Sequence, residues 1–184
     1  LDALVTPEAA GGSLLLVLAL WLGSLATFAL IKPVDPRNAA SSSTTPHLAA
    51  RALLPGALVA SVQAVLLGAL GAAYGSLDAP HAAGLIGALL VAGLAFTTVN
   101  HALAAWAGVW GRLVSGAMLL VTTVCALTYS APGIFSALRP LSPLSPALDA
   151  VRAAVTWQSG ALMVVTLIGW GLLGLLAGVW RIAR

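Results

Sequence analysis

Long runs of apolar residues, separated by short polar stretches, set the pattern of this chain. Five runs are long enough to cross a membrane as helices, at about residues 13–31, 56–74, 83–106, 113–131 and 160–179. None shows the ten-residue alternation of an outer-membrane barrel strand, so helices are favoured. The sequence therefore predicts an all-α, polytopic membrane protein with one transmembrane domain over residues 1–184.

Composition supports this prediction and narrows the function. Of the 184 residues, 60% are hydrophobic and 7% are charged, whereas a soluble domain has about 25% charged residues. The eight Lys and Arg residues form no cluster, which argues against nucleic acid binding. The predicted partner is the lipid bilayer. The one cysteine, Cys125, lies in an apolar run and is interpreted as a small packing residue.

The basic residues predict an orientation. Five spans place six basic residues on one side and two on the other: Lys32, Arg37, Arg51, Arg112, Arg181 and Arg184 against Arg139 and Arg152. Because Lys and Arg are enriched in cytoplasmic loops, we expect a plasma-membrane protein with its N-terminus outside and its C-terminus in the cytoplasm. The chain begins without an initiator Met or a basic signal region, so we expect missing residues upstream.

The cytoplasmic loop at 32–55 contains a predicted short helix over residues 46–54, with Pro55 at the mouth of the second span. On this helix, a histidine and an arginine four residues apart would share one face, with a leucine on another side. The candidate residues for docking a partner are His47, Leu48 and Arg51.

The stretch from Arg112 to Gln158 is expected to organise the rest of the chain. After the fourth span, residues 132–158 form an apolar segment interrupted by prolines. Irregular backbone is tolerated at the membrane only when it is buried in protein or lies at the interface. One interpretation is an apolar connector, and the other, which we favour, is a re-entrant, gate-like element on the outer face. Its candidate residues are Pro132, Phe135, Pro140, Pro143, Asp149 and Arg152.

A short amphipathic helix is predicted within this outer segment. Ser145-Pro146 is a good helix start. Three apolar residues then form one stripe, and Asp149 and Arg152 lie three apart on another face. The stripe consists of Leu148, Val151 and Val155.

Few polar residues lie inside the predicted spans. Asn100 and His101 fall in the cytoplasmic third of the third span, where a structural hydrogen bond is the favoured role and lining a substrate path is second. His101 has no second ligand nearby, so no metal site is predicted. No Asp or Glu lies within a span, which disfavours proton or sodium coupling. No catalytic motif appears, so neither an enzyme nor a cofactor is expected.

Small residues recur at intervals of four, which lets helices approach closely. Ordinary packing is the favoured interpretation, and a homodimer seam is the other. The pairs are Ala64/Gly68, Gly71/Gly75, Gly84/Ala88 and Gly174/Gly178.

Several segments together resemble YhgE/Pip membrane proteins of the ABC-2 permease group. They are Leu20-Trp21-Leu-Gly23, Asn100-His-Ala-Leu103 with Gly108 and Gly111, Pro132-x-x-Phe135-x-x-Leu138-x-Pro140-x-x-Pro143, and Leu148-Asp-Ala-Val-Arg152-Ala-Ala-Val155. The resemblance implies an ABC-2-permease-like fold, with one more span and a large extracellular domain upstream. Members are described as phage-infection proteins and as accessory proteins of type VII-like secretion.

Two functions follow from this resemblance. In the first, the chain is a membrane subunit that moves a substrate outward, and a separate cytoplasmic ATPase docks on the helix at 46–54. In the second, the chain is a non-transporting anchor that presents an extracellular domain to secretion components or a phage. The lack of charged residues in the spans motivates the second.

Overall fold

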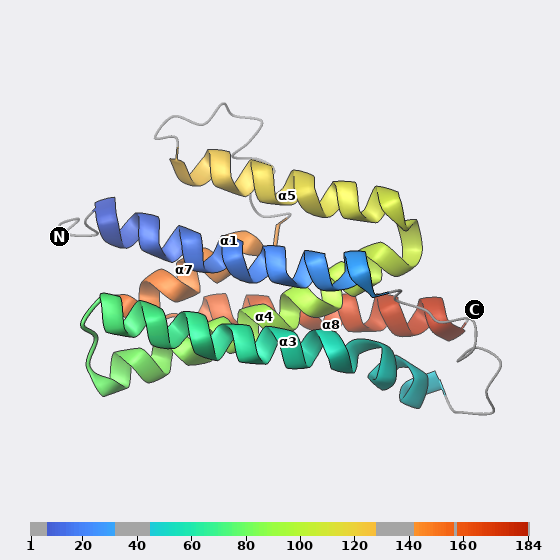
Figure 1. The fold of residues 1–184 in the computed structure, drawn as a ribbon, viewed down its shortest axis with the longest axis horizontal. Helices are drawn as coiled ribbons and strands as arrows, with labels where there is room; N and C mark the ends of the chain where they lie inside the picture. The colour runs from blue at the N-terminus through green and yellow to red at the C-terminus, as the bar shows by residue number, and fades with distance from the viewer. Residues whose placement is uncertain (1–6, 32–44, 128–141, 157, 184) are drawn as a thin grey trace.

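The computed structural model describes residues 7–31, 45–127, 142–156 and 158–183, and within these ranges every regular element is a helix (Figure 1). The helices are α1 (Pro7–Leu30), α3 (Thr45–Tyr74), α4 (Ala79–Ala107), α5 (Val109–Leu127), α7 (Leu144–Val155) and α8 (Ala161–Ala183). All but α7 are long and apolar enough to cross a membrane. The all-helical, five-span prediction is therefore confirmed.

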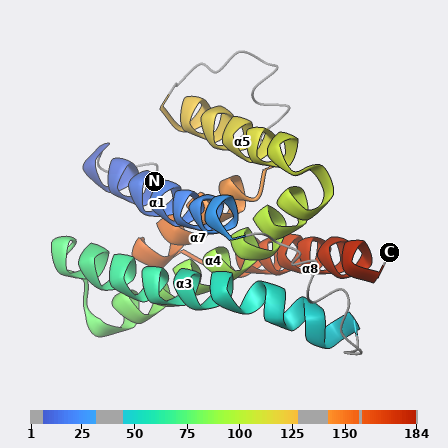
Figure 2. The same cartoon turned by 45° about the vertical axis from the view of Figure 1, so that its right-hand side comes forward.

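The bundle is organised around α4. This helix contacts each of the other five described helices, and α5 lies outermost against it (Figures 1 and 2). Leu85, Leu89 and Phe96 on α4 are almost completely buried. The expectation that residues 112–158 organise the chain is thus wrong for the described part, because the helix that contacts all the others is the third span.

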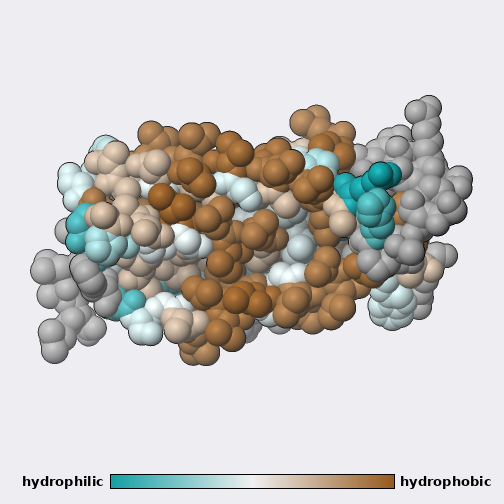
Figure 3. Space-filling view, turned by 90° about the horizontal axis from the view of Figure 1, so that it is seen from below, coloured by the Kyte–Doolittle hydropathy of each residue, from teal (hydrophilic) through white to brown (hydrophobic). Residues whose placement is uncertain are grey.

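The outer surface of the bundle suits a lipid environment. Apolar residues cover the middle of the face shown in Figure 3, and hydrophilic residues gather toward its two ends. Large apolar side chains such as Leu66 on α3 and Leu173 on α8 are about 60% exposed. Because lipid tails are as apolar as leucine, this exposure is favourable in a bilayer. The protein is a multi-pass membrane protein.

Charge separates the two ends of the bundle. The C-terminal ends of α1, α4 and α8 meet the N-terminal ends of α3 and α5 at what we call the basic end, which carries Arg51, Arg112 and Arg181. The opposite end holds the α3–α4 turn, the end of α5 and the start of α8, with Asp78 among its residues. Within the described ranges, the arginines that the sequence analysis groups on one side of the membrane lie at the same end of the bundle.

The predicted break between a short helix and the second span is wrong. α3 is continuous from Thr45 to Tyr74 and contains Pro55. A proline removes one backbone hydrogen bond, here the one that the Arg51 carbonyl would accept. Arg51 is exposed near the start of the helix, where water can bond that carbonyl. Residues 32–44 of the predicted loop lie outside the described ranges.

The turn before the fourth span is shorter than predicted. Gly108 alone separates α4 from α5, with φ 55° and ψ −118°, a backbone conformation that favours glycine. Gly111 allows the close approach of the two helices, since a Cβ there would collide with the backbone oxygen of Leu103. α5 consequently begins at Val109, and residues 128–131 of the predicted span lie outside the described ranges.

α7 is confirmed as a helix but begins earlier than predicted. It starts at Leu144 after Pro143, and the Leu144 N–H donates to the Ser142 hydroxyl at 3.3 Å, so Ser145 is not its N-cap. Both Leu148 and Val151 are buried. α7 packs against α1, α4, α5 and α8, in the half of the bundle toward the opposite end (Figure 1). It is therefore an internal helix packed among four spans, and not an exposed amphipathic helix.

Candidate functional site

The centre of the bundle contains a hydrogen-bonded chain of polar side chains. The Asn100 amide donates to the Ser24 hydroxyl at 3.2 Å and accepts from the Ser115 hydroxyl at 2.5 Å. The Trp21 indole N–H donates to the Ser115 carbonyl at 3.2 Å. All are buried. This polar network joins α1, α4 and α5, so the structural hydrogen bond expected for Asn100 is present.

His101 lies apart from that network. Its ring is 1% exposed and meets the edge of Phe28 with centroids 5.4 Å apart. Gly178 of α8 leaves room for it, because a Cβ at that position would lie 2.9 Å from His101 Nδ1. Asn100 and His101 are neighbours in sequence but point to different helix pairs.

At the basic end, two arginines cap neighbouring helices. Arg112 donates to the Phe28 carbonyl of α1 at 3.1 Å, and Arg181 donates to the Ala105 carbonyl of α4 at 3.2 Å. Both carbonyls are in the last turn of their helix, where no backbone donor is available and a cation is favourable. The role of these two arginines as helix caps was not predicted from the sequence. The sequence feature that could have predicted it is an arginine within one turn of the end of a span.

The candidate docking residues lie at the basic end as well. His47 and Arg51 are exposed in the first two turns of α3, and Leu48 is half-buried. The four-residue spacing places the two polar side chains on one face of a helix. The structure therefore presents them together on a surface that the rest of the described bundle leaves open.

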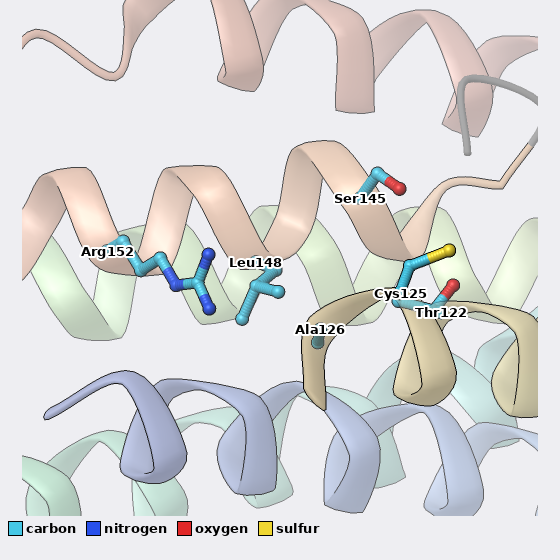
Figure 4. A pocket seen from close by; sticks show the side chains of 6 residues that line it. All are labelled: Thr122, Cys125, Ala126, Ser145, Leu148 and Arg152. Atoms are coloured by element: carbon cyan, nitrogen blue, oxygen red, sulfur yellow. The ribbon is translucent and has the colours of Figure 1, made fainter. Parts of the chain in front are cut away.

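A small, partly open cavity lies between the end of α5 and α7. Its volume is about 80 Å³, enough for several water molecules or one small anion. α5 and α7 each supply three of the side chains in Figure 4: Thr122, Cys125, Ala126, Ser145, Leu148 and Arg152.

One hydrogen bond fixes the start of α7 beside this cavity. The hydroxyls of Thr122 and Ser142 are 3.2 Å apart and both residues are buried. Among the outer candidate residues, the structure places Arg152 on the cavity, and Pro143 and Asp149 on the same short segment. Pro132, Phe135 and Pro140 lie outside the described ranges. Cys125 and Thr122 were not predicted as site residues, because nothing in the sequence pairs α5 with α7.

No family model, curated protein or solved structure matches this chain. In addition, no group of three or more potential metal-ligating side chains occurs within the described ranges. The candidate site is therefore defined by its own geometry, which is a cavity beside an internal helix.

The Asp78 carboxyl at the opposite end makes a contact that depends on its ionisation. Asp78 precedes α4 and accepts hydrogen bonds from the His81 ring and from the His81 backbone N–H, the latter at 3.2 Å. The side-chain hydrogen bond with His81, and then the backbone one, lower the pKa of the Asp78 carboxyl below 3.8. A carboxylate that caps a helix N-terminus is stabilising.

Replacing Asp78 with alanine is expected to lower the thermal unfolding midpoint in detergent at neutral pH. Because the folded pKa of the Asp78 carboxyl is lowered from its ordinary value, the stabilisation is present above the unfolded pKa and is lost as the pH falls through the folded pKa. Wild type and Asp78→Ala should therefore converge in acid. Asp78→Asn retains an acceptor and serves as the control. A difference that persists unchanged in acid would contradict the role of the carboxylate.

Proposed function

We propose that this protein is the membrane subunit of an ABC-2-like export or secretion system that moves a substrate outward or helps to move it. The observation that carries the proposal is α7, an internal helix of 12 residues. At 1.5 Å per residue it is about 18 Å long, whereas the hydrocarbon layer is about 30 Å thick. A helix that enters the bundle without crossing it suits a gate.

The position of α7 supports this role. It packs against four spanning helices near one end of the bundle, and the cavity lies along its contact with α5. The hydroxyls of Thr122 and Ser142, 3.2 Å apart, form a hydrogen bond between α5 and the residue that precedes the start of α7. In this proposal, α7 moves relative to α5 to open an outward path. The resemblance to YhgE/Pip proteins leads to the same placement of a re-entrant element before the last span.

The basic end provides the docking surface in this proposal. An excess of Lys and Arg favours the cytoplasmic side, which places His47 and Arg51 in the cytoplasm and the N-terminus outside. A cytoplasmic ATPase binds the exposed start of α3, and α3 transmits its movement across the bundle. The continuity of α3 through Pro55 suits that role, since a rigid helix transmits displacement better than a hinged one.

The second candidate function is a non-transporting anchor that presents an extracellular domain to secretion components or a phage. The polar network favours it. Asn100 is hydrogen-bonded to Ser24 and Ser115, so these groups are satisfied by one another and need no substrate. An anchor requires only that the helices pack stably.

Photo-crosslinking from native membranes discriminates between the two functions. A photoreactive amino acid at position 47, which is exposed near the start of α3, is expected to capture a nucleotide-binding ATPase. The matched control is position 74, at the other end of the same helix and 97% exposed. Position 74 should capture no ATPase, since it lies on the outer side in this proposal.

The outcomes separate cleanly. Capture of the ATPase from position 47 alone supports the export subunit. Capture of secretion components without an ATPase supports the anchor and rejects docking on α3. Equal capture from both positions would indicate non-specific labelling and would also reject the docking proposal.

A further inference from the structure

The Arg152 side chain is the only cationic group that lines the cavity between α5 and α7 within the described ranges. Its Nε is buried and has no hydrogen-bond acceptor in the described chain. No ion pair joins Arg152 to an acidic residue of these ranges. Because a guanidinium stays charged at any physiological pH, an anionic acceptor in the cavity would stabilise this side chain.

The other lining groups suit an oxyanion. Ser145 and Thr122 bring hydroxyls to the cavity wall, and Cys125 brings a thiol. The Arg152 guanidinium is a favourable donor for phosphate, because its planar fork binds two oxygens at once, and Figure 4 shows Leu148 between it and the hydroxyl end of the cavity. The volume of about 80 Å³ admits one such group and no large ligand.

The position of the cavity near the helix ends indicates which kind of molecule would supply the anion. Thr122, Cys125 and Ala126 lie within the last six residues of α5, and Arg152 is three residues from the end of α7. These positions are within about 8 Å of the helix ends, close to where lipid headgroups meet the hydrocarbon layer. Val124, on the same turn of α5 as the cavity, is exposed and offers an apolar surface for an acyl chain.

We propose that this cavity binds a phosphate oxyanion and that Arg152 is the main protein group that contacts it. The favoured source of the phosphate is the headgroup of an anionic lipid. The inference goes beyond the proposed function and does not depend on it, because a bound lipid is compatible with an exporter and with an anchor. For the exporter, the lipid would sit at the contact between α5 and α7 and set how readily the two helices separate.

Binding is measured on the purified full chain in detergent, without an ATPase. The probes are dioleoyl-phosphatidylglycerol, dioleoyl-phosphatidylcholine and inorganic phosphate, followed by native mass spectrometry and by the thermal unfolding midpoint. Phosphatidylglycerol is expected to bind with a stoichiometry of one tight site and to raise the midpoint. Arg152→Gln should weaken that binding about tenfold to a hundredfold, the loss typical of a charge-assisted hydrogen bond.

Two further variants keep the result interpretable. Arg181→Gln removes an arginine at the basic end, far from the cavity, and should leave the tight site intact. Cys125→Leu fills the cavity while retaining Arg152, and should also weaken the tight binding. It provides a second test if Arg152→Gln fails to fold.

Each result bears on the proposal. Loss of binding in Arg152→Gln and Cys125→Leu, with retention in Arg181→Gln, supports it. Equal stabilisation by inorganic phosphate supports the oxyanion site and identifies free phosphate as its source. The proposal is overturned if Arg152→Gln leaves the binding of phosphatidylglycerol unchanged. It is also overturned if wild type binds neither phosphatidylglycerol nor inorganic phosphate. None of these readouts depends on export, so failure here leaves the crosslinking test of the proposed function independent.

Discussion

Replacing Trp21 with alanine is expected to lower the free energy of unfolding by about 3 kcal/mol. The Trp21 side chain is completely buried, its ring meets the edge of Phe96 with centroids 4.8 Å apart, and its N–H bonds the Ser115 carbonyl. Truncation would remove both contacts and leave a void between α1, α4 and α5. In lipid the transfer contribution is small, so lost packing supplies most of the effect.

Denaturation in mixed micelles measures this loss in the free energy of unfolding. It is followed by circular dichroism, because that signal does not depend on tryptophan. Trp110→Ala is the matched control, because Trp110 is 74% exposed on α5 and has little packing to lose. Trp21→Phe should recover much of the stability by restoring a ring against Phe96. Equal stabilities for Trp21→Ala and Trp110→Ala would show that the packing of α1 on α4 contributes little.

Gly174→Ala is expected to destabilise the protein by about 2 kcal/mol. A Cβ at Gly174 would lie 2.7 Å from the backbone atoms Thr98 C and Val99 N of α4. Backbone atoms cannot rotate away as a side chain can, so α8 would have to shift as a whole. The shift would also disturb the contact between Gly178 and His101, one turn further along the same face of α8.

The control for this substitution is on the same helix. Gly169→Ala adds the same methyl group at a position with nothing within 4 Å, and it should be neutral or slightly stabilising because alanine has the higher helix propensity. Unfolding midpoints of both variants in one detergent give the comparison. If Gly174→Ala were as stable as Gly169→Ala, the close approach of α8 to α4 would not matter for stability.

The number and order of the spans could be predicted from sequence because each span is a long apolar run. Which face of each span packs inward could not. α3 and α4 are apolar on all sides, so their sequence carries no periodic stripe from which to identify a core face. The central position of α4 consequently emerged only from the structure, although Asn100 and His101 already marked it as unusual.

The small-residue pairs illustrate the same limit. Gly68 lies against Ile86 of α4, and Gly174 lies against Thr98 of α4. The favoured interpretation of these two pairs, ordinary packing, is confirmed within one chain. Spacing alone shows that a helix can be approached closely, but it does not identify the approaching helix. A homodimer contact stays a prediction and would need a different face.

The candidate site was predicted in part. The spacing of Asp149 and Arg152 indicated the amphipathic character of α7, and Arg152 does line the cavity. The helix was expected at the membrane surface because it carries these charges. Instead, Leu148 and Val151 are buried among four helices, since the neighbouring spans offer an apolar cleft that a short helix fills. The partner residues on α5 follow from tertiary packing, which no local pattern encodes.

The central place of α4 has a consequence for how the chain is assembled during synthesis. α1, α3 and α4 contact one another, so these three helices can associate while the ribosome is still translating α5. α8 emerges last of the described helices, and its main neighbour is α4. Among the described helices, the last to join is therefore a completed helix that docks laterally onto a preformed surface, and the glycines of α8 set how closely it can dock.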